Sequence, residues 1–453
     1  MVSVKKPVRS KSGITPLTVV LKPKRCDHGV CIYCPGGDFV PQSYTDKSPA
    51  IMRAMALQYD IGKQVKARME SLVAMGHPVE KIELIFIGGT FLQYPVDYQY
   101  ESVKACYDVL NEKKSKTLDE AKKLNESAKH RVVAFCIENR PDNCSNEDIK
   151  RMREFGCTRV ELGVQILCNL VYKKVNRGHT VQDVVDATKR LKDAGFKVGY
   201  HIMPGIPYSN PKKDLAKFKL VFKDERFRPD QLKIYPCQIV ETSALSKIYK
   251  KINYKPYTDE QIKSLVKEMF KVIPRYCRVM RIMREIPKEK MKLEAASTSM
   301  RGDLHKELKN KGLKEIRLRE IGFQNPEEVD LNVKLKVFEY NASGGQEYFL
   351  EIVNKDDVLF GLLRLRIKSV GKSKIALVRE LHVYGQSLNL GEKGFISQHK
   401  GFGKWLMSEA EKIAKEKNCK DIKVISGVGV REYYRKLGYE LDDTEYEYMV
   451  KRL

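Results

Sequence analysis

The sequence lacks the features of membrane and secreted proteins. Among its 453 residues, no apolar run approaches the ~18 residues that a membrane-spanning helix needs. The first residues, MVSVKKPVRSKSG, contain no apolar stretch of the kind that forms a secretory signal. We therefore expect a cytoplasmic protein with no membrane partner. At ~150 residues per domain, the length favours two or three domains.

Acidic residues are comparatively few. The chain has 58 Asp and Glu residues against 84 Lys and Arg residues, which gives a formal net charge of +26. This excess favours a polyanionic partner, nucleic acid before anionic membrane, although solubility alone is an alternative reason for it. No basic amphipathic helix with a clean apolar face is apparent, so we favour nucleic acid. A basic arm precedes the first acidic residue, and its expected phosphate contacts are Lys5, Lys6, Arg9 and Lys11.

The cysteines do not fit a disulfide framework. Their number, 11, is odd, and no secretory signal supports an oxidising compartment. Most are isolated in apolar surroundings, where a cysteine usually acts as a small core residue. Three others, Cys26, Cys31 and Cys34, fall within nine residues at the spacing Cys-x4-Cys-x2-Cys. They form the strongest local signal in the chain.

Three closely spaced thiols can bind one metal centre. Zinc in a structural site normally takes four ligands, and a fourth is not obvious nearby, although His28 could serve. A [4Fe-4S] cluster held by only three cysteines keeps one iron open. That iron can bind the amino and carboxylate groups of S-adenosylmethionine. A zinc knuckle and an iron–sulfur cluster are therefore the two alternatives.

Short apolar runs alternate with helical patterns in the first half of the chain. Such alternation favours parallel βα units, and only about six units fit before residue ~250, too few for an eight-fold barrel. We therefore predict an α/β fold with a partial (βα) barrel. The first run ends in Gly88, Gly89 and Thr90, as expected where backbone approaches a ligand. The strand candidates are residues 81–87, 131–137, 159–164, 197–203 and 231–235.

The second half has a different pattern. Residues 285–320 are rich in Lys, Arg and Glu, and we interpret them as a linker region with a helix near residues 304–311. A glycine-bearing turn then opens a long amphipathic helix at residues 403–417. Such a turn leaves backbone N–H groups free for an anion such as a pyrophosphate. The strand candidates before it are residues 331–340, 349–353, 359–367 and 375–384.

The cysteine segment resembles a known family. The three cysteines, with an aromatic residue just before the third, look like the radical S-adenosylmethionine signature, although the first gap is one residue longer than the commonest spacing. Cys-Ile-Tyr-Cys-Pro-Gly-Gly followed by Gln-Ser-Tyr, together with the motifs at residues 161–165, 176–180 and 203–207, is similar to the catalytic subunit of the Elongator complex. The resemblance implies a [4Fe-4S] cluster on the three clustered cysteines. It also implies S-adenosylmethionine against the Gly-Gly-Thr turn.

The C-terminal segment resembles the GNAT-type N-acetyltransferases, whose acetyl-CoA loop looks like Gln-x-x-Gly-x-Gly. Tyr433 and Tyr434 lie where that fold places a general acid, and only one of two adjacent helical residues should face the cofactor. The resemblance favours Tyr434. Glu380 could act as a base or could pair with a nearby arginine. The implied acetyl-CoA contacts are Lys81, Glu380, Leu381, His382, Val383, Gln398, Gly401, Phe402, Gly403, Lys404 and Tyr434.

The family resemblance covers nearly the whole chain and implies four segments. Many family members have a zinc-binding cysteine near residues 313–317, and its absence here leads us to predict no such zinc site. The expected segments are a basic N-terminal arm at 1–25, a radical SAM domain at 26–275, a linker region at 276–330 and a GNAT acetyltransferase domain at 331–453.

The implied activity is modification of C5 of the wobble uridine in the anticodon loop of tRNA. Acetyl-CoA supplies two carbons, a 5′-deoxyadenosyl radical takes hydrogen from the acetyl methyl, and thioester hydrolysis leaves a carboxymethyl group. Elongator-type partner subunits or a homodimer are expected partners. The alternative is a histone-type protein lysine acetyltransferase with a structural metal cluster. A non-catalytic tRNA-binding module is disfavoured by the intact thiols and tyrosines.

Overall fold

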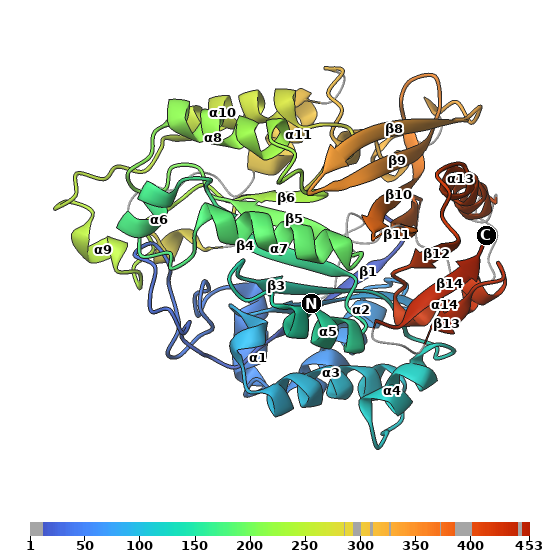
Figure 1. The fold of residues 1–453 in the computed structure, drawn as a ribbon. Coiled ribbons are helices and arrows are strands. Elements are labelled where there is room, and N and C mark those ends of the chain that lie inside the picture. The colour runs from blue at the N-terminus through green and yellow to red at the C-terminus, as the bar shows by residue number, and fades with distance from the viewer. Residues whose placement is uncertain are drawn as a thin grey trace.

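The protein consists of two seven-stranded sheets with helices packed against them (Figure 1). None of the helices in the described ranges is long and apolar enough to cross a membrane. The computed structural model describes residues 12–284, 286–292, 300–308, 311–325, 328–371, 373–385, 401–442 and 446–453.

The first sheet is entirely parallel, and its strands follow one another in sequence order. Its edge strands β1 and β7 do not pair with each other, so the sheet is an open half-barrel. This confirms the predicted partial (βα) barrel. Its strands are β1 (Thr15–Val20), β2 (Lys81–Ile87), β3 (Arg131–Asn139), β4 (Arg159–Gln165), β5 (Lys197–Ile202), β6 (Gln231–Ile234) and β7 (Arg278–Ile282).

Helices connect these strands and cover the half-barrel from outside (Figure 1). Several begin at a side-chain cap, and α7 starts with a capping box between Thr180 and Asp183. The helices are α1 (Pro49–Ala56), α2 (Ile61–Ala74), α3 (Val96–Leu110), α4 (Leu118–Asn125), α5 (Asn146–Glu154), α6 (Asn169–Lys174), α7 (Val181–Asp193), α8 (Pro211–Lys223), α9 (Leu245–Ile248), α10 (Asp259–Val272), α11 (Met300–Leu308) and α12 (Ile316–Arg319).

Two strands of the half-barrel lie where the sequence predicted none. Strand β1 falls inside the expected basic arm, and β7 falls inside the expected linker region. The sheet therefore extends beyond residues 26–275 at both ends. Strand β7 contains two arginines, and one of them, Arg278, pairs with the buried carboxylate of Glu320, a contact that its local sequence does not reveal.

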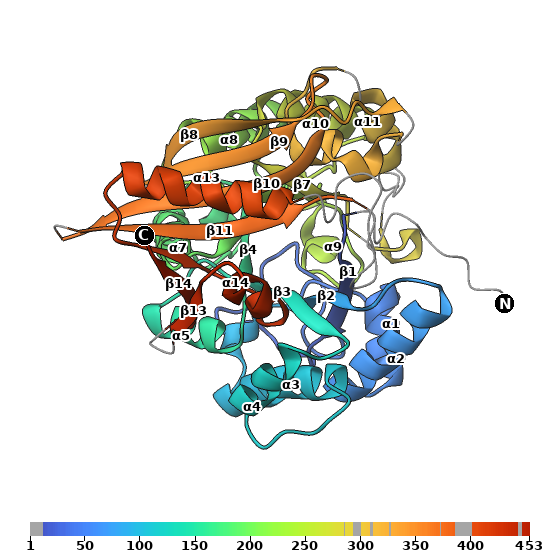
Figure 2. The same ribbon diagram turned by 90° about the vertical axis from the view of Figure 1, so that its right-hand side faces the viewer.

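The second sheet is mixed. Among its described strands, only β11 and β12 pair in parallel, and α13 (Phe402–Glu416) runs between them in the chain and lies across the sheet face, as Figure 2 shows. The short helix α14 (Arg431–Arg435) follows β12. The strands are β8 (Lys334–Ala342), β9 (Gly345–Val353), β10 (Leu359–Val370), β11 (Ser373–Val383), β12 (Asp421–Val424), β13 (Glu440–Asp442) and β14 (Tyr448–Arg452).

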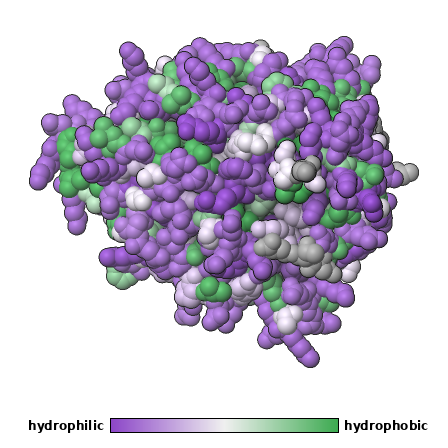
Figure 3. Space-filling model, viewed as in Figure 1, coloured by the Kyte–Doolittle hydropathy of each residue, from purple (hydrophilic) through white to green (hydrophobic). Residues whose placement is uncertain are grey.

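The second sheet docks at the amino-terminal ends of the half-barrel strands. Lys197, the first residue of β5, pairs with Glu380 of β11 at 2.5 Å. After β12, Gly427 lies so close to Val133 in β3 that a Cβ atom at position 427 would overlap the Val133 carbonyl. One hydrophobic core contains buried side chains of both sheets. Hydrophilic side chains cover most of the face shown in Figure 3.

Candidate active site

A cavity of about 1410 Å³ joins the two halves of the molecule. It contains the three clustered cysteines at one end and the predicted acetyl-CoA residues at the other. Gly88 is not among its lining residues. Gln398, Lys5, Lys6, Arg9 and Lys11 lie outside the described residues. The predicted site residues that line the cavity are Cys26, Cys31, Cys34, Lys81, Gly89, Thr90, Glu380, Leu381, His382, Val383, Gly401, Phe402, Gly403, Lys404, Tyr433 and Tyr434.

The cysteine loop is anchored by hydrogen bonds to the segment after β4. The amide of Ile32 donates to the Val175 carbonyl at 3.1 Å, and Asn176 Nδ2 donates to the Val30 carbonyl at 2.9 Å. Cys31 and Cys34 are buried, whereas Cys26 is partly exposed. The loop is thus fixed across the carboxyl end of the half-barrel, where open α/β sheets usually bind ligands.

Positive charge surrounds the thiols. Arg177 is buried and donates to Cys31 Sγ at 3.6 Å and to the Gly163 carbonyl at 2.6 Å. Arg140 donates to His28 Nε2 at 3.1 Å, and the same nitrogen lies 3.3 Å from Cys31 Sγ. Burial, with Arg140 and Arg177 nearby, lowers the pKa of His28 to about 4, so its ring is neutral near pH 7. Burial raises the pKa of the Cys26 thiol, and the two arginines oppose that shift and favour an anionic cluster.

The spacing of the thiols fits a polynuclear cluster better than a single zinc ion. A tetrahedral zinc with Zn–S bonds of ~2.3 Å would hold its sulfur ligands ~3.8 Å apart. Among the described residues, the groups whose metal-ligand atoms all lie within 4.8 Å of one another do not include these three cysteines. His28 Nε2 already accepts from Arg140. The donor set therefore fits an iron–sulfur cluster, with Cys26, Cys31 and Cys34 as its ligands.

The Gly-Gly-Thr turn lies beside the cysteine loop at the carboxyl end of β2. Gly88 and Gly89 have φ angles of 130° and 102°, which favour glycine. A Cβ atom on Gly88 would lie 3.1 Å from that of Leu21, so this glycine packs behind the cavity wall. Thr90 Oγ1 lies 4.0 Å from Cys26 Sγ. The turn thus leaves space and a hydroxyl group next to one of the thiols.

A layer of charged side chains lines the cavity between its two ends, and the sequence analysis did not identify it. Buried Glu161 accepts from His201 Nε2 at 2.9 Å and pairs with Lys233, which also lies 3.1 Å from Glu138. Burial would raise the pKa of Glu161, but Lys233 and His201 outweigh it and hold that pKa well below its usual value. Lys233 thus neutralises carboxylates that could otherwise attract a cation. Because Glu138, Glu161, His201 and Lys233 lie on four different strands, no local motif in the sequence indicates that they meet.

The N-terminus of α13 forms the acetyl-CoA end of the cavity. Gly401 caps the helix with a φ angle of 81°, and the next residues line the cavity. A Cβ atom on Gly403 would lie 2.5 Å from the Tyr433 hydroxyl, so glycine is required for this phenol to approach the helix. Free N–H groups at a helix N-terminus attract anions, which fits the predicted pyrophosphate site.

Both adjacent tyrosines line the cavity, so the lining alone does not choose which of them faces the cofactor. Their ring centroids lie 5.3 Å apart with an interplanar angle of 79°. Burial raises the pKa of Tyr433 to about 12, and it raises the pKa of Tyr434 as well. Each phenol therefore keeps its proton near neutral pH and can donate it. The choice between them as general acid stays a prediction.

Glu380 is an ion-pair residue. Its two oxygens accept from Lys197 Nζ at 2.5 Å and from Arg364 Nε at 2.7 Å. Burial would raise the pKa of Glu380, but Lys197 and Arg364 outweigh it and hold that pKa far below its usual value. A carboxylate so strongly held is a poor proton acceptor. The structure therefore supports the pairing alternative. Lys81 lines the same cavity, and burial lowers its pKa.

Sequence comparisons match the chain to the radical SAM superfamily and, over nearly its whole length, to a smaller group of proteins. The radical SAM superfamily model matches residues 20–218, and that of the radical SAM C-terminal domain matches residues 229–311. The tRNA uridine(34) acetyltransferase of Dehalococcoides mccartyi is 46% identical over 451 residues, which cover 97% of this chain and 98% of that protein. The Elongator complex protein 3 of Saccharomyces cerevisiae is 38% identical, with 99% of this chain and 84% of that protein covered.

A solved structure extends the likeness to the whole fold. The archaeal Methanocaldococcus infernus Elp3 with an N-terminal deletion matches with a TM-score of 0.85 and 39% identity, covering 98% of this chain and 100% of that one. The match includes the half-barrel, the second sheet and the segments that form the cavity between them. The chain thus belongs to the family of the tRNA uridine(34) acetyltransferases and Elongator complex protein 3.

Proposed function

We propose that this protein attaches a carboxymethyl group to C5 of the wobble uridine of tRNA, with acetyl-CoA and S-adenosylmethionine as cosubstrates. The observation that carries this proposal is the single cavity that contains both the three thiols and the helix N-terminus with the two tyrosines. A radical formed at one end could reach a thioester bound at the other without either leaving the protein. The names of the relatives support tRNA as the substrate.

At the thiol end, the residues of the chain would bind the cluster and orient S-adenosylmethionine. Cys26, Cys31 and Cys34 would hold the iron–sulfur cluster, and Gly89 and Thr90 would border the S-adenosylmethionine beside it. Bound there, these groups would supply a radical able to remove hydrogen from an unactivated methyl group.

At the acetyl-CoA end, the residues hold an anion and supply a proton. The N-terminus of α13 would hold the pyrophosphate through its free N–H groups. Tyr434 or Tyr433, both protonated near neutral pH, would donate a proton to the departing CoA thiolate. Glu380 stays ionised and acts through its ion pairs.

Basic side chains in the cavity fit an RNA substrate. A uridine splayed from the anticodon loop could enter the cavity while its flanking phosphates meet these cations. Affinity for tRNA should therefore fall as salt concentration rises. Partner subunits, a homodimer and a cytoplasmic location stay predictions. Some lining arginines already contact ionisable side chains of the protein, namely Arg140, Arg159, Arg177, Arg278 and Arg379. The other lining arginines, which are the candidates for phosphate contacts, are Arg53, Arg68, Arg281, Arg284 and Arg317.

The test is acetyl-CoA hydrolysis by the anaerobically reconstituted protein with and without tRNA. We expect tRNA to stimulate hydrolysis and its wobble uridine to gain a carboxymethyl group, measured by mass spectrometry. A transcript with cytidine at the wobble position is the matched control and should gain no such group. Hydrolysis that is no faster with tRNA than without would contradict the proposal.

The same assay distinguishes the tRNA-modifying function from the alternative, a protein lysine acetyltransferase. That enzyme would acetylate basic peptides and ignore tRNA, and its metal cluster would only support the fold. The position of the thiols on the wall of the acetyl-CoA cavity disfavours a purely structural cluster. We therefore prefer the tRNA-modifying function.

A further inference from the structure

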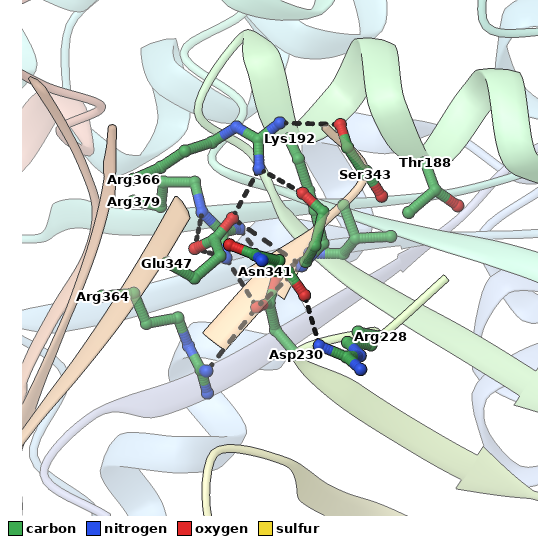
Figure 4. Close-up of polar contacts among 12 residues, drawn as sticks. Thr188, Lys192, Arg228, Asp230, Asn341, Ser343, Glu347, Arg364, Arg366 and Arg379 are labelled. Atoms are coloured by element: carbon green, nitrogen blue, oxygen red, sulfur yellow. Dashed lines mark hydrogen bonds and ion pairs between the residues drawn. The ribbon is translucent and has the colours of Figure 1, made fainter. Parts of the chain in front are cut away.

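A buried network of ionisable side chains connects the half-barrel to the second sheet (Figure 4). Most ion pairs in proteins are solvent-exposed, whereas the charged side chains of this network are largely buried. The half-barrel supplies Lys192, Asp193, Lys197 and Asp230, and the second sheet supplies Glu347, Arg364, Arg366, Arg379 and Glu380.

Asp230 is at the centre of this network. It immediately precedes β6, and its Oδ2 accepts from the Val198 amide at 2.8 Å. Its backbone also bonds to Val198 and to Arg278, which ties it to β5 and β7. The two carboxylate oxygens accept from both terminal nitrogens of Arg379, at 2.7 and 2.8 Å. Asp230 is thus fixed in the half-barrel, and it accepts two parallel hydrogen bonds from Arg379 of the second sheet.

A β-bulge in β11 directs two consecutive side chains toward the half-barrel. Arg364 of β10 lies opposite Glu380, and the next residue along β10 lies opposite Val378, so Arg379 has no partner across this pair. In a regular strand, neighbouring side chains point to opposite faces. The bulge removes that constraint, so Arg379 contacts Asp230 while Glu380 contacts Lys197.

The residues that follow Glu380 belong to the acetyl-CoA end of the cavity. Leu381, His382 and Val383 continue β11 and line the cavity. Arg379 and Glu380 therefore attach the half-barrel directly to the strand that carries these residues. A displacement of Asp230 relative to Arg379 would move the acetyl-CoA contacts relative to the half-barrel and to the cysteine loop at its carboxyl end.

Stability alone is a weak reason for such a network. Withdrawing charges from water costs free energy, and replacing a buried ion group by apolar side chains of similar volume is often neutral or stabilising. Charged hydrogen bonds have directional geometry that apolar packing lacks, so they can define the relative orientation of two domains. This argues for an orienting role.

We propose that Asp230 is a positioning residue that, through Arg379 and the bulge in β11, aligns the acetyl group with the radical-forming end of the cavity. The inference rests on the proposed function, because alignment matters only if both ends take part in one reaction. Near-attack geometry is demanding, and a misplacement of ~1 Å can cost ~100-fold in rate.

The test replaces Asp230 with Asn, which keeps the shape of the side chain and removes its charge. With acetyl-CoA that carries a deuterated methyl group, hydrogen abstraction transfers deuterium into 5′-deoxyadenosine. We expect Asp230→Asn to lower deuterium transfer per cleaved S-adenosylmethionine by ~10-fold or more. Acetyl-CoA binding and S-adenosylmethionine cleavage itself should stay close to the wild-type values.

Asp357→Asn is the matched control. Asp357, between β9 and β10, accepts from Arg275 at 2.8 Å across the same boundary between domains, and neither residue lies on β11 or α14 or lines the cavity. Its substitution should leave deuterium transfer unchanged. An equal loss in both variants would show general loosening and would overturn the specific role of Asp230, as would unchanged transfer in Asp230→Asn.

A second measurement does not depend on the cofactors. Amide hydrogen exchange of residues 381–384, measured without cluster or S-adenosylmethionine, should be faster in Asp230→Asn than in the wild type and in Asp357→Asn. Unchanged exchange would overturn the proposal. If Asp230→Asn does not fold, Lys197→Gln removes the other link to β11 and should give the same pattern with a smaller loss. Absence of deuterium transfer in the wild type would refute the proposed function, while the exchange measurement would still decide the role of Asp230.

Discussion

The two ends of the cavity are built in different ways. The thiol end comes from one short loop, whose cysteines lie within nine residues and which hydrogen bonds to Val175 and Asn176 hold against the half-barrel. The acetyl-CoA end combines residues of β2, β11, α13 and α14, and buried charges hold it to the other domain. The first end should therefore depend on the chemistry of a few atoms, and the second on the relative placement of two domains.

The largest expected effect comes from removing one thiol. Cys31→Ser should abolish both iron binding and carboxymethylation, because a hydroxyl is a poor ligand for an iron–sulfur cluster. Acetyl-CoA affinity should stay unchanged, because the other end of the cavity does not depend on the cluster. Iron analysis and mass spectrometry of tRNA measure the two outcomes. Cys419→Ser, in a buried cysteine outside the loop, is the control and should keep its iron.

A steric substitution at the domain contact should have the next largest effect. Gly427→Ala places a methyl group against the Val133 carbonyl, and the two domains must separate to accept it. We expect a loss of about 3 kcal/mol in the free energy of unfolding. Gly302→Ala, at a helical glycine with open space around it, should be neutral or slightly stabilising. Equal stability of both variants in denaturant unfolding would show that the close contact is not required.

The two tyrosines allow a finer test of the acetyl-CoA end. Tyr434→Ala should reduce tRNA-dependent acetyl-CoA hydrolysis by ~100-fold if its phenol is the general acid. Tyr433→Phe keeps the ring over Gly403 and removes only the hydroxyl. The rate of CoA release measures both. A normal rate in Tyr434→Ala with a reduced rate in Tyr433→Phe would assign the acid to Tyr433.

The smallest effect is a pH dependence of stability. The folded-state pKa of Glu380 is lowered, so its ion pairs contribute fully above the unfolded-state pKa of ~4.3 and are lost progressively below it. Glu380→Gln should therefore be less stable than the wild type near pH 7, and the difference should shrink as the pH falls below ~4. Chemical denaturation at several pH values measures it, and a constant difference would contradict the pairing.

Local sequence predicted the features that depend on neighbouring residues. Strand β2 was predicted with its observed bounds because five of its seven residues are apolar and they lead directly into the glycines. The cysteine loop and the glycine turn before α13 were recognised for the same reason, because a short motif contains the chemistry and the geometry together. The order of motifs along the chain then indicated the family.

Other features depend on partners that lie far away in the chain. Arg379 and Asp230 are separated by 149 residues, so neither local sequence indicates the pair. Strand β1 was missed because its six residues are polar in part and follow a basic segment. The charged layer around Glu161 was missed because its members come from different strands. These features arise only when the two sheets are in place.

The bulge in β11 also limits how the two domains could be recombined. A chimera that grafted another acetyltransferase domain onto this half-barrel would need the same unpaired residue before Glu380. Without it, the ladder would alternate regularly, and one of the two consecutive side chains would turn away from the barrel. Each domain of such a chimera could fold well, and the acetyl-CoA end of the cavity would still be misaligned with the thiol end.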